Sequence, residues 1–436
     1  MSVSSFSRLA TANTYDNALR NLQSRQASIS TLQESLTSGK KVTRPSDDPT
    51  GAAQAERAMN RIARIATDQR ALEAQRNAIA QAEGTLGDVT SALQNFRELV
   101  VSAGNAAYGS SERATIAGQL SGLKDQILAL ANTKDSNGMP LFAALGSALT
   151  PFGGPNAVAP DYTFNGLPGQ ANAGTYAIPF ALDGESAFMH QPSRDGAFTA
   201  TLSTIPSDRT LQTGGITLAS GGSSTVAAKA LAAQAANGSD YPTYVLTITG
   251  SAPSATVPGT TDITYDLVET PALTPSASAT GLTASYPTGQ SANITITDIP
   301  GLQFNLQGTP AVGDTVTVDF TRSVFSVLDN AIEGIGKASN GNAASQAVGQ
   351  ALHNIDISMA RVSAVRGQAG DLLGRADRIT STNEKRTIEQ ESNRSRAEDL
   401  DMVQGISDFQ NQQTGYSAAL QSYAQVQRLS LFNFIS

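Results

Sequence analysis

The sequence of 436 residues contains no cysteine, no tryptophan and only two histidines, His190 and His353. Without cysteine there are no disulfides, thiolate metal sites or cysteine nucleophiles, and two unpaired histidines leave little scope for imidazole catalysis or metal binding. The net charge is −8, whereas binding to nucleic acid or to an anionic membrane requires clustered positive charge. No apolar run approaches the roughly 20 residues that span a bilayer. These absences predict a protein that is not an enzyme, has no metal or cofactor, binds no nucleic acid and does not insert into a membrane.

Proline divides the chain into regions. Of 18 prolines, 15 lie between Pro151 and Pro310, and the last 126 residues have none. Because proline interrupts helices, long helices are possible only outside this middle region. Residues 151–320 also carry 12 acidic and 3 basic residues. We therefore expect an acidic insert carried by two nearly neutral helical arms.

The arms show heptad periodicity. In the N-terminal arm, apolar residues recur every seven positions at Ile65, Leu72, Ile79, Leu86, Leu93 and Val100. This spacing is typical of helices that pair as coiled coils. It predicts one long helix over 59–103 and a shorter returning helix over 116–130. Residues 348–379 carry a matching stripe in the C-terminal arm.

The middle region has the pattern of a β domain. Short runs rich in Thr, Val, Ile and Tyr alternate with turn residues, which favours an antiparallel sandwich or roll. The expected strands are 176–180, 197–203, 244–249, 262–268, 293–298, 302–306 and 315–320, with an Ala-rich helix over 225–236. The fold class predicted is α+β, a long helical bundle or coiled coil formed by both arms, with an inserted antiparallel β-rich domain.

Both ends of the chain carry an apolar stripe. An isolated amphipathic helix is marginal in water until its apolar face is covered. The two stripes could cover each other within one chain or could wait for neighbouring subunits, and the apolar tail could fold onto the chain's own core. The candidate assembly residues are Leu22, Ile29, Leu32, Leu36, Met402, Ile406, Phe409, Tyr416, Leu420, Tyr423, Leu429, Leu431, Phe432 and Phe434.

Polar motifs have structural interpretations. Asp47 and Asp48 could serve acid–base chemistry or bind a cation, but Asp48 followed by Pro49 is typical of a helix N-terminus, so we expect a helix cap. Residues 135–138 are expected to form a turn. The polar run 384–398, with Glu391, Arg394 and Glu398, is either a solvated helix face or a subunit contact.

Four segments resemble one family of bacterial flagellar proteins. Residues 38–55 (SGKKVTRPSDDPTGAAQA) look like the N-terminal signature shared by flagellins and hook–filament junction proteins. Residues 135–142 (DSNGMPLF), 327–332 (VLDNAI) and 427–432 (QRLSLF) are similar to other parts of that family. Pro49 after two aspartates, and the aromatic-rich ending, look more like the junction branch than the filament branch.

The resemblance implies a structural subunit of the flagellum that forms the hook–filament junction by self-assembly. It implies an extracellular protein exported without a cleaved signal peptide, and the N-terminal residues indeed lack the features of one. Expected partners are other copies of the chain, hook-associated protein 1, flagellin and an export chaperone that binds the C-terminal segment. The implied organisation is an assembly segment 1–45 that is disordered in the monomer, a helical rod 46–145, an outer β-rich domain 146–322, a second part of the rod 323–398, and a second disordered assembly segment 399–436.

Three other functions stay open from the sequence. A filament flagellin would have the same physics and another place in the organelle. A surface adhesin or glycan-binding protein would use the insert, although that region has few aromatics. An enzyme fits the residue inventory least.

Overall fold

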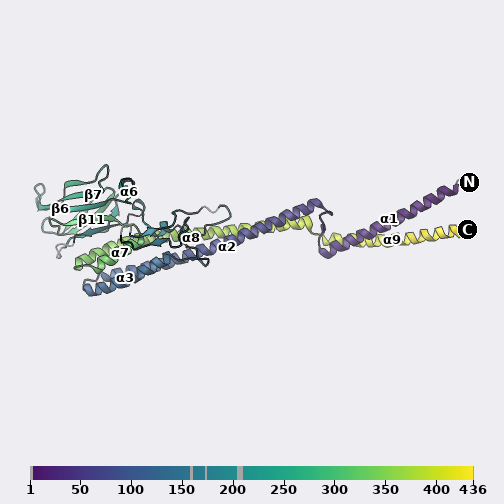
Figure 1. Cartoon of the computed structure of the whole chain (residues 1–436), viewed down its shortest axis with the longest axis horizontal. Coiled ribbons are helices and arrows are strands. Elements are labelled where there is room, and N and C mark those ends of the chain that lie inside the picture. The colour runs from purple at the N-terminus through teal and green to yellow at the C-terminus, as the bar shows by residue number, and fades with distance from the viewer. Residues whose placement is uncertain (1–2, 158–160, 172–173, 204–209, 436) are drawn as a thin grey trace. The chain divides into compact units, whose positions relative to one another are not determined.

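The structure, a computed structural model, describes the backbone of residues 3–157, 161–171, 174–203 and 210–435 (Figure 1). Within those ranges it describes the side chains of residues 16–425 other than residue 237. The chain forms two compact units: unit 1 is Met1–Ala71 with Arg378–Ser436, and unit 2 is Leu72–Asp377. Two long helices, α2 (Pro49–Ala103) and α8 (Gly341–Glu398), contribute residues to both units.

Unit 1 is helical. Helix α1 (Val3–Ser38) packs along α9 (Met402–Ile435), and the first turns of α2 lie beside the last turns of α8. Polar side chains join this second pair: Gln69 Nε2 donates to Thr380 Oγ1 at 3.1 Å, and Arg61 Nη1 donates to Gln390 Oε1 at 3.4 Å. Because early residues of α2 meet late residues of α8, the two helices are antiparallel.

The heptad stripe of α2 is buried along its whole length, which confirms the prediction of a long helix that packs against others. Its predicted positions are at most 6% exposed. In unit 2, three ion pairs cross between α2 and α8 on the outer side of this apolar seam: Arg76 with Asp377, Arg97 with Asp356, and Arg366 with Glu83.

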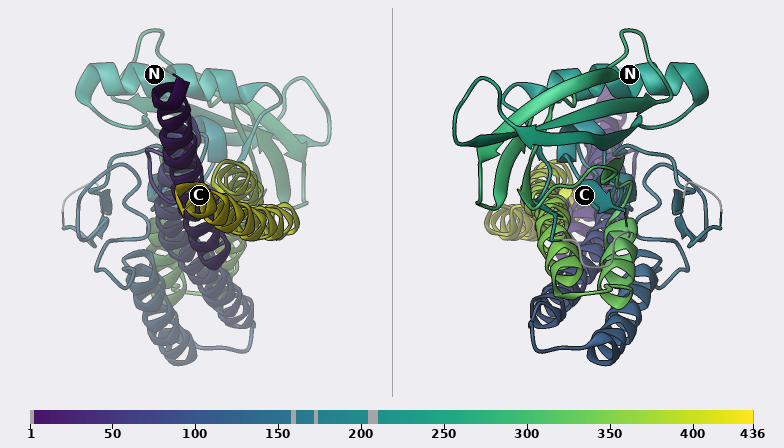
Figure 2. Two further views of the ribbon diagram at one scale, coloured as in Figure 1. Left: turned by 90° about the vertical axis from the view of Figure 1, so that its right-hand side faces the viewer. Right: turned by 90° about the vertical axis from the view of Figure 1, so that its left-hand side faces the viewer.

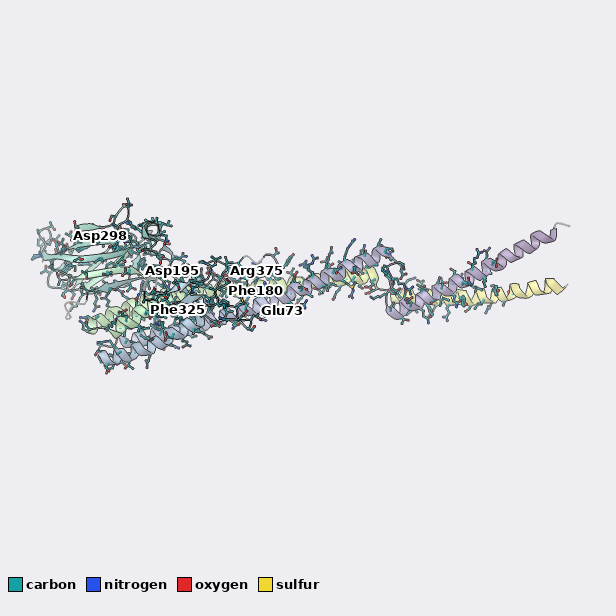
Figure 3. All side chains as sticks on the ribbon, in the orientation of Figure 1. Glu73, Phe180, Asp195, Asp298, Phe325 and Arg375 are labelled. Atoms are coloured by element: carbon teal, nitrogen blue, oxygen red, sulfur yellow. The ribbon has the colours of Figure 1, made fainter. Side chains whose placement is uncertain are left out.

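Two further helices complete the helical part of unit 2. Helix α3 (Ser110–Ala131) packs along α7 (Val324–Gly336). The first turn of α7 places Phe325, which is labelled in Figure 3, in a cluster of aromatic rings. Its ring centroid lies 5.2–5.8 Å from those of Phe152, Tyr162 and Phe188. This cluster fixes the start of α7 against the beginning of the insert, where the two-stranded sheet β1 (Phe152–Gly153) and β2 (Thr163–Phe164) lies.

Beyond this small sheet, the described part of the insert contains two larger antiparallel sheets. The larger has the strand order β3-β11-β6-β7-β8. In the smaller, β10 pairs with β9 along one edge and with β4 and then β5 along the other. The strands are drawn as arrows in Figure 2. The strands are β3 (Phe198–Leu202), β4 (Gln212–Thr213), β5 (Thr217–Leu218), β6 (Thr243–Pro253), β7 (Thr260–Thr270), β8 (Ala279–Pro287), β9 (Ala292–Ile296), β10 (Leu302–Gly308) and β11 (Thr315–Phe320).

The two sheets share one apolar core. Alternate residues of the strands point into it, such as Tyr244, Leu246 and Ile248 of β6 and Phe304 of β10. The Ala-rich helix, α6 (Gly222–Asn237), adds Val226 to the same core. Strand alternation thus identified a β domain, and the predicted α+β class is confirmed.

One predicted strand is wrong, and several described elements, including β8 and two short helices, were not predicted. Residues 176–180 form a turn and an irregular segment, not a strand, because the Ile178 N–H donates to the side chain of Gln75 on α2 at 3.1 Å. Strand β8 was missed because it is a sheet edge whose residues are half-buried or exposed, which weakens the apolar alternation. The short helices α4 (Gly184–Phe188) and α5 (Pro192–Asp195) are too brief for a periodic signal.

Helix α8 covers the free edge of β3. Gln350 Oε1 accepts from the Ala200 N–H at 2.8 Å, and Gln346 Nε2 donates to the Ala200 carbonyl oxygen at 3.2 Å. One turn further, Asn354 Nδ2 donates to the Phe198 carbonyl oxygen at 3.0 Å. Amides spaced by four residues therefore satisfy an edge that would otherwise be open to another strand.

Candidate assembly site

In unit 1, the break between α1 and α2 meets the break between α8 and α9. Helix α1 ends before Gly39, whose φ of +72° suits glycine, and α8 ends at Glu398. Backbone hydrogen bonds join the breaks: the Lys41 N–H donates to the Glu398 carbonyl oxygen at 2.8 Å, and the Leu400 N–H donates to the Gly39 carbonyl oxygen at 2.9 Å. The Lys40 amine also forms an ion pair with the Glu398 carboxylate.

The acidic pair after α1 organises the start of α2. Asp48 Oδ1 accepts from the N–H of Thr50 at 3.0 Å and of Gly51 at 2.9 Å, and Pro49 is the first helical residue. These bonds, led by the Gly51 N–H, lower the pKa of Asp48. Asp47 accepts from the Arg44 N–H at 2.8 Å, which lowers its pKa also. Both carboxylates are thus occupied by neighbouring donors, an arrangement that caps a helix and shapes a turn.

Three residues at and within α9, namely Asp401, Gly405 and Gly415, were not singled out from the sequence. Asp401 Oδ1 accepts from the Val403 N–H at 3.0 Å and so caps α9. A Cβ at Gly405 would lie 3.2 Å from a Leu36 methyl, and one at Gly415 would lie 2.6 Å from the Arg25 guanidinium. The two glycines therefore let α1 approach α9 closely. An Asp immediately before the apolar stripe that starts at Met402 is a cap signal that could have identified Asp401.

The predicted apolar stripes are only partly covered by each other. On α1, Leu22 is buried, while Ile29, Leu32 and Leu36 are half-buried. On α9, Phe409, Tyr416 and Tyr423 are half-buried, whereas Met402, Ile406 and Leu420 remain 43–46% exposed. The side chains of Leu429, Leu431, Phe432 and Phe434 lie outside the described residues. The pair of helices thus leaves a row of apolar side chains open to solvent.

The polar run on α8 has a mixed environment. Glu398 pairs with Lys40, Arg394 is half-buried, and Glu391 is exposed. The run therefore combines contacts to distant segments of the same chain, through Glu398 and Gln390, with exposed charge.

The described residues offer little for other kinds of site. No group of three or more His, Asp or Glu among them could hold a metal ion, and no helix in the described part of the chain has the length and apolar character to cross a bilayer. In unit 2, a cavity of about 430 Å³ lies between β3, α7 and α8. Its described lining contains no aromatic side chain, so it lacks the ring surfaces on which sugars stack.

Comparisons with known proteins agree with this architecture. Residues 9–146 match the family described as "Bacterial flagellin N-terminal helical region". The "Flagellar hook-associated protein 3" of Salmonella typhimurium is 35% identical over 154 residues, which cover 33% of this chain and 46% of that protein. A flagellin of Bacillus subtilis is 33% identical over 129 residues, 29% of this chain and 42% of that protein.

Solved structures show the same fold. The flagellar junction protein FlgL of Legionella pneumophila superposes with a TM-score of 0.57 at 22% identity, over 79% of this chain and all of that one. FlgL of Xanthomonas campestris superposes with a TM-score of 0.53 at 20% identity, over 74% of this chain and 98% of that one.

The N-terminal region is similar to the helical region of flagellins, and the helical arms with an inserted β domain have the fold of the solved junction-protein structures. Among the curated relatives, the chain is similar to hook-associated protein 3. The matches span about half the length of those relatives.

Proposed function

We propose that this chain is a structural subunit of the bacterial flagellum that forms the junction between hook and filament. The observation that carries the proposal is the row Met402, Ile406 and Leu420, which stays exposed after α1 and α9 have paired. Apolar side chains exposed in a row mark a surface that another protein covers. The similarity to hook-associated protein 3 and to junction-protein structures supports the same role.

In this proposal, assembly is driven by burial of the terminal helices against neighbouring subunits. The N-terminal segment 1–45 and the C-terminal segment 399–436 order fully only in the assembled ring, whereas the β domain contributes outer surface. Partners are further copies of the chain, hook-associated protein 1, flagellin and an export chaperone for the C-terminal segment, and the protein reaches the flagellum without a cleaved signal.

Substitution of the exposed row tests the proposal. Ile406→Ser with Leu420→Ser should leave the melting temperature of the free chain within about 2 °C, since exposed substitutions cost little, but should abolish incorporation into flagella. Val257→Ser with Val312→Ser is the matched control, because these side chains on the insert are 50% and 64% exposed. Normal incorporation of the α9 variant, measured by immunoblot of isolated flagella, would contradict the role of this row.

Deletion of the gene tests the place in the organelle. Electron microscopy should then show hooks without filaments, with flagellin shed into the medium. If hooks instead carried filaments made of another protein, or if the purified chain polymerised without limit, the filament subunit would be the better assignment.

A further inference from the structure

A polar cleft of about 390 Å³ lies in unit 1 between α2 and α8. Its described charged residues are all arginines: Arg57 and Arg61 come from α2 and Arg396 from α8. The rest of the lining is neutral and consists of Gln54, Ala58, Gln390, Asn393 and Ala397.

The guanidinium groups of this cleft have only neutral acceptors. Arg61 donates to Gln390 Oε1 at 3.4 Å, and Arg396 donates to Asn393 Oδ1 at 2.7 Å. Among the described residues, neither these two nor Arg57 has a carboxylate within ion-pair distance. In the unit 2 part of the same two helices, by contrast, Arg76, Arg97 and Arg366 each pair with a carboxylate, as described above. The cleft therefore holds positive charge that the described part of the chain leaves without a counter-charge.

Unit 2 of the chain carries an excess of negative charge that could balance these arginines in a neighbouring copy. Unit 1 contains 16 Lys and Arg against 13 Asp and Glu, a net charge of +3, whereas unit 2 contains 13 against 24, a net charge of −11. A ring of identical subunits is built from heterologous contacts, in which one surface of each copy meets a different surface of the next. Opposite net charges on two units of one chain supply such a pair of surfaces and fix which surface meets which.

We propose that the arginine cleft (Arg57, Arg61 and Arg396) receives carboxylates from unit 2 of a second copy in the assembled ring. The proposal rests on the proposed function, because it names the partner surface for the same assembly. Guanidinium groups suit this role since they bind carboxylates through two parallel N–H donors. The contact orients the subunits, while the terminal helices bury the apolar surface.

Zero-length cross-linking tests the contact. Arg61→Lys keeps the charge and introduces an amine, which a carbodiimide couples to a carboxylate in contact with it, forming an amide and releasing the activated oxygen as a urea. Arg70→Lys is the matched control: residue 70 is also exposed on α2, and nine residues at 100° each place it on the opposite side of the helix. Flagella isolated from cells expressing each full-length variant are treated, and the dimer band is mapped by mass spectrometry.

The Arg61→Lys chain should give a dimer that links position 61 to an Asp or Glu of unit 2, with a yield at least about fivefold above that of Arg70→Lys. Raising the salt from 0.05 to 0.5 M during cross-linking should reduce the yield, because exposed charge pairs are screened. Links to unit 1 only, equal yields from the two variants, or a link to a different flagellar protein would overturn the proposal.

Charge reversal provides a second measurement. Arg61→Glu should reduce incorporation into flagella at least about tenfold, and Arg70→Glu less than twofold, because only the first places like charges in contact. Circular dichroism of both free chains should show unchanged helix content, since Glu and Arg have similar helix propensity. Equal incorporation of the two variants would overturn the inference, whereas absence of the unmodified chain from flagella would overturn the proposed function itself.

Discussion

Lys124 on α3 donates to Asp329 Oδ1 on α7 at 2.8 Å, and the hydroxyl of Tyr162 donates to the other oxygen of the same carboxylate at 2.6 Å. Lys124 is 8% exposed. One carboxylate thus joins two helices of the bundle to the beginning of the insert. Asp329 lies in the segment 327–332, one of the segments that suggested the family, and this bridge is a physical reason for an aspartate there.

Removing that carboxylate should destabilise unit 2 more than removing the amine. Asp329→Ala leaves the phenol hydroxyl without its acceptor and leaves the buried ammonium only the exposed Asp125 carboxylate at 3.8 Å, so we expect a loss of about 2–3 kcal/mol of unfolding free energy. Lys124→Met fills the same space without charge and should cost less than about 1 kcal/mol. Urea unfolding monitored by circular dichroism measures both. Equal losses, or the reverse order, would show that the bridge does not control this junction.

His190 is buried where the insert meets α8. Its Nδ1 lies 3.0 Å from the carbonyl oxygen of Thr321, which can only accept, so Nδ1 carries the proton. Its Nε2 lies 3.3 Å from the Ser358 hydroxyl of α8. Burial lowers the pKa of His190 to about 4, and the charge of Arg361 acts in the same direction, while the charge of Asp195 opposes it.

This pKa predicts acid sensitivity well above the carboxylate range. An exposed histidine has a pKa of about 6.5, so between pH 6.5 and 4 the unfolded chain binds a proton that the folded chain excludes. The stabilisation is complete above pH 6.5 and decreases as the pH falls, by about 2 kcal/mol between pH 7 and pH 5. His190→Gln should flatten the dependence of the melting temperature on pH in this window. His353→Gln is the control, and a curve for His190→Gln as steep as that of the control would refute the assignment.

Two glycines of α2 offer a matched test of the break between the helices. A Cβ at Gly51 would lie 2.5 Å from a carboxylate oxygen of Asp48 and 3.1 Å from the carbonyl oxygen of Ala397, whereas at Gly84 nothing lies within 4 Å. Gly84→Ala should stabilise the chain by about 0.5–1 kcal/mol, because alanine is the better helix former. Gly51→Ala should instead destabilise it by about 1–3 kcal/mol, because the cap must shift. Stabilisation by Gly51→Ala in thermal melts would contradict the close packing at this site.

Local periodicity determined much of the architecture. The heptad of Ile65 to Val100 predicts α2, because a spacing of seven gives an apolar stripe only in a helix. Alternation in residues 244–249 and 315–320 predicts strands for the corresponding reason. The crowding of prolines between Pro151 and Pro310 places the insert. Each of these signals depends on residues that are close together in the sequence. It can therefore be recognised without knowledge of the fold.

Only the tertiary structure decided which residues far apart in the sequence are in contact. The pairing of β3 with β11, the cover that Gln350 gives to β3, and the ion pair between Lys40 and Glu398 join residues more than 100 positions apart. The arginine cleft likewise forms because the antiparallel arrangement brings Arg57 beside Arg396. Such contacts are selected by the packing of whole elements and leave no periodic trace in the sequence. The sequence therefore determined which segments are helices, strands and apolar stripes, and the fold determined which of their charges and edges remain for a neighbour.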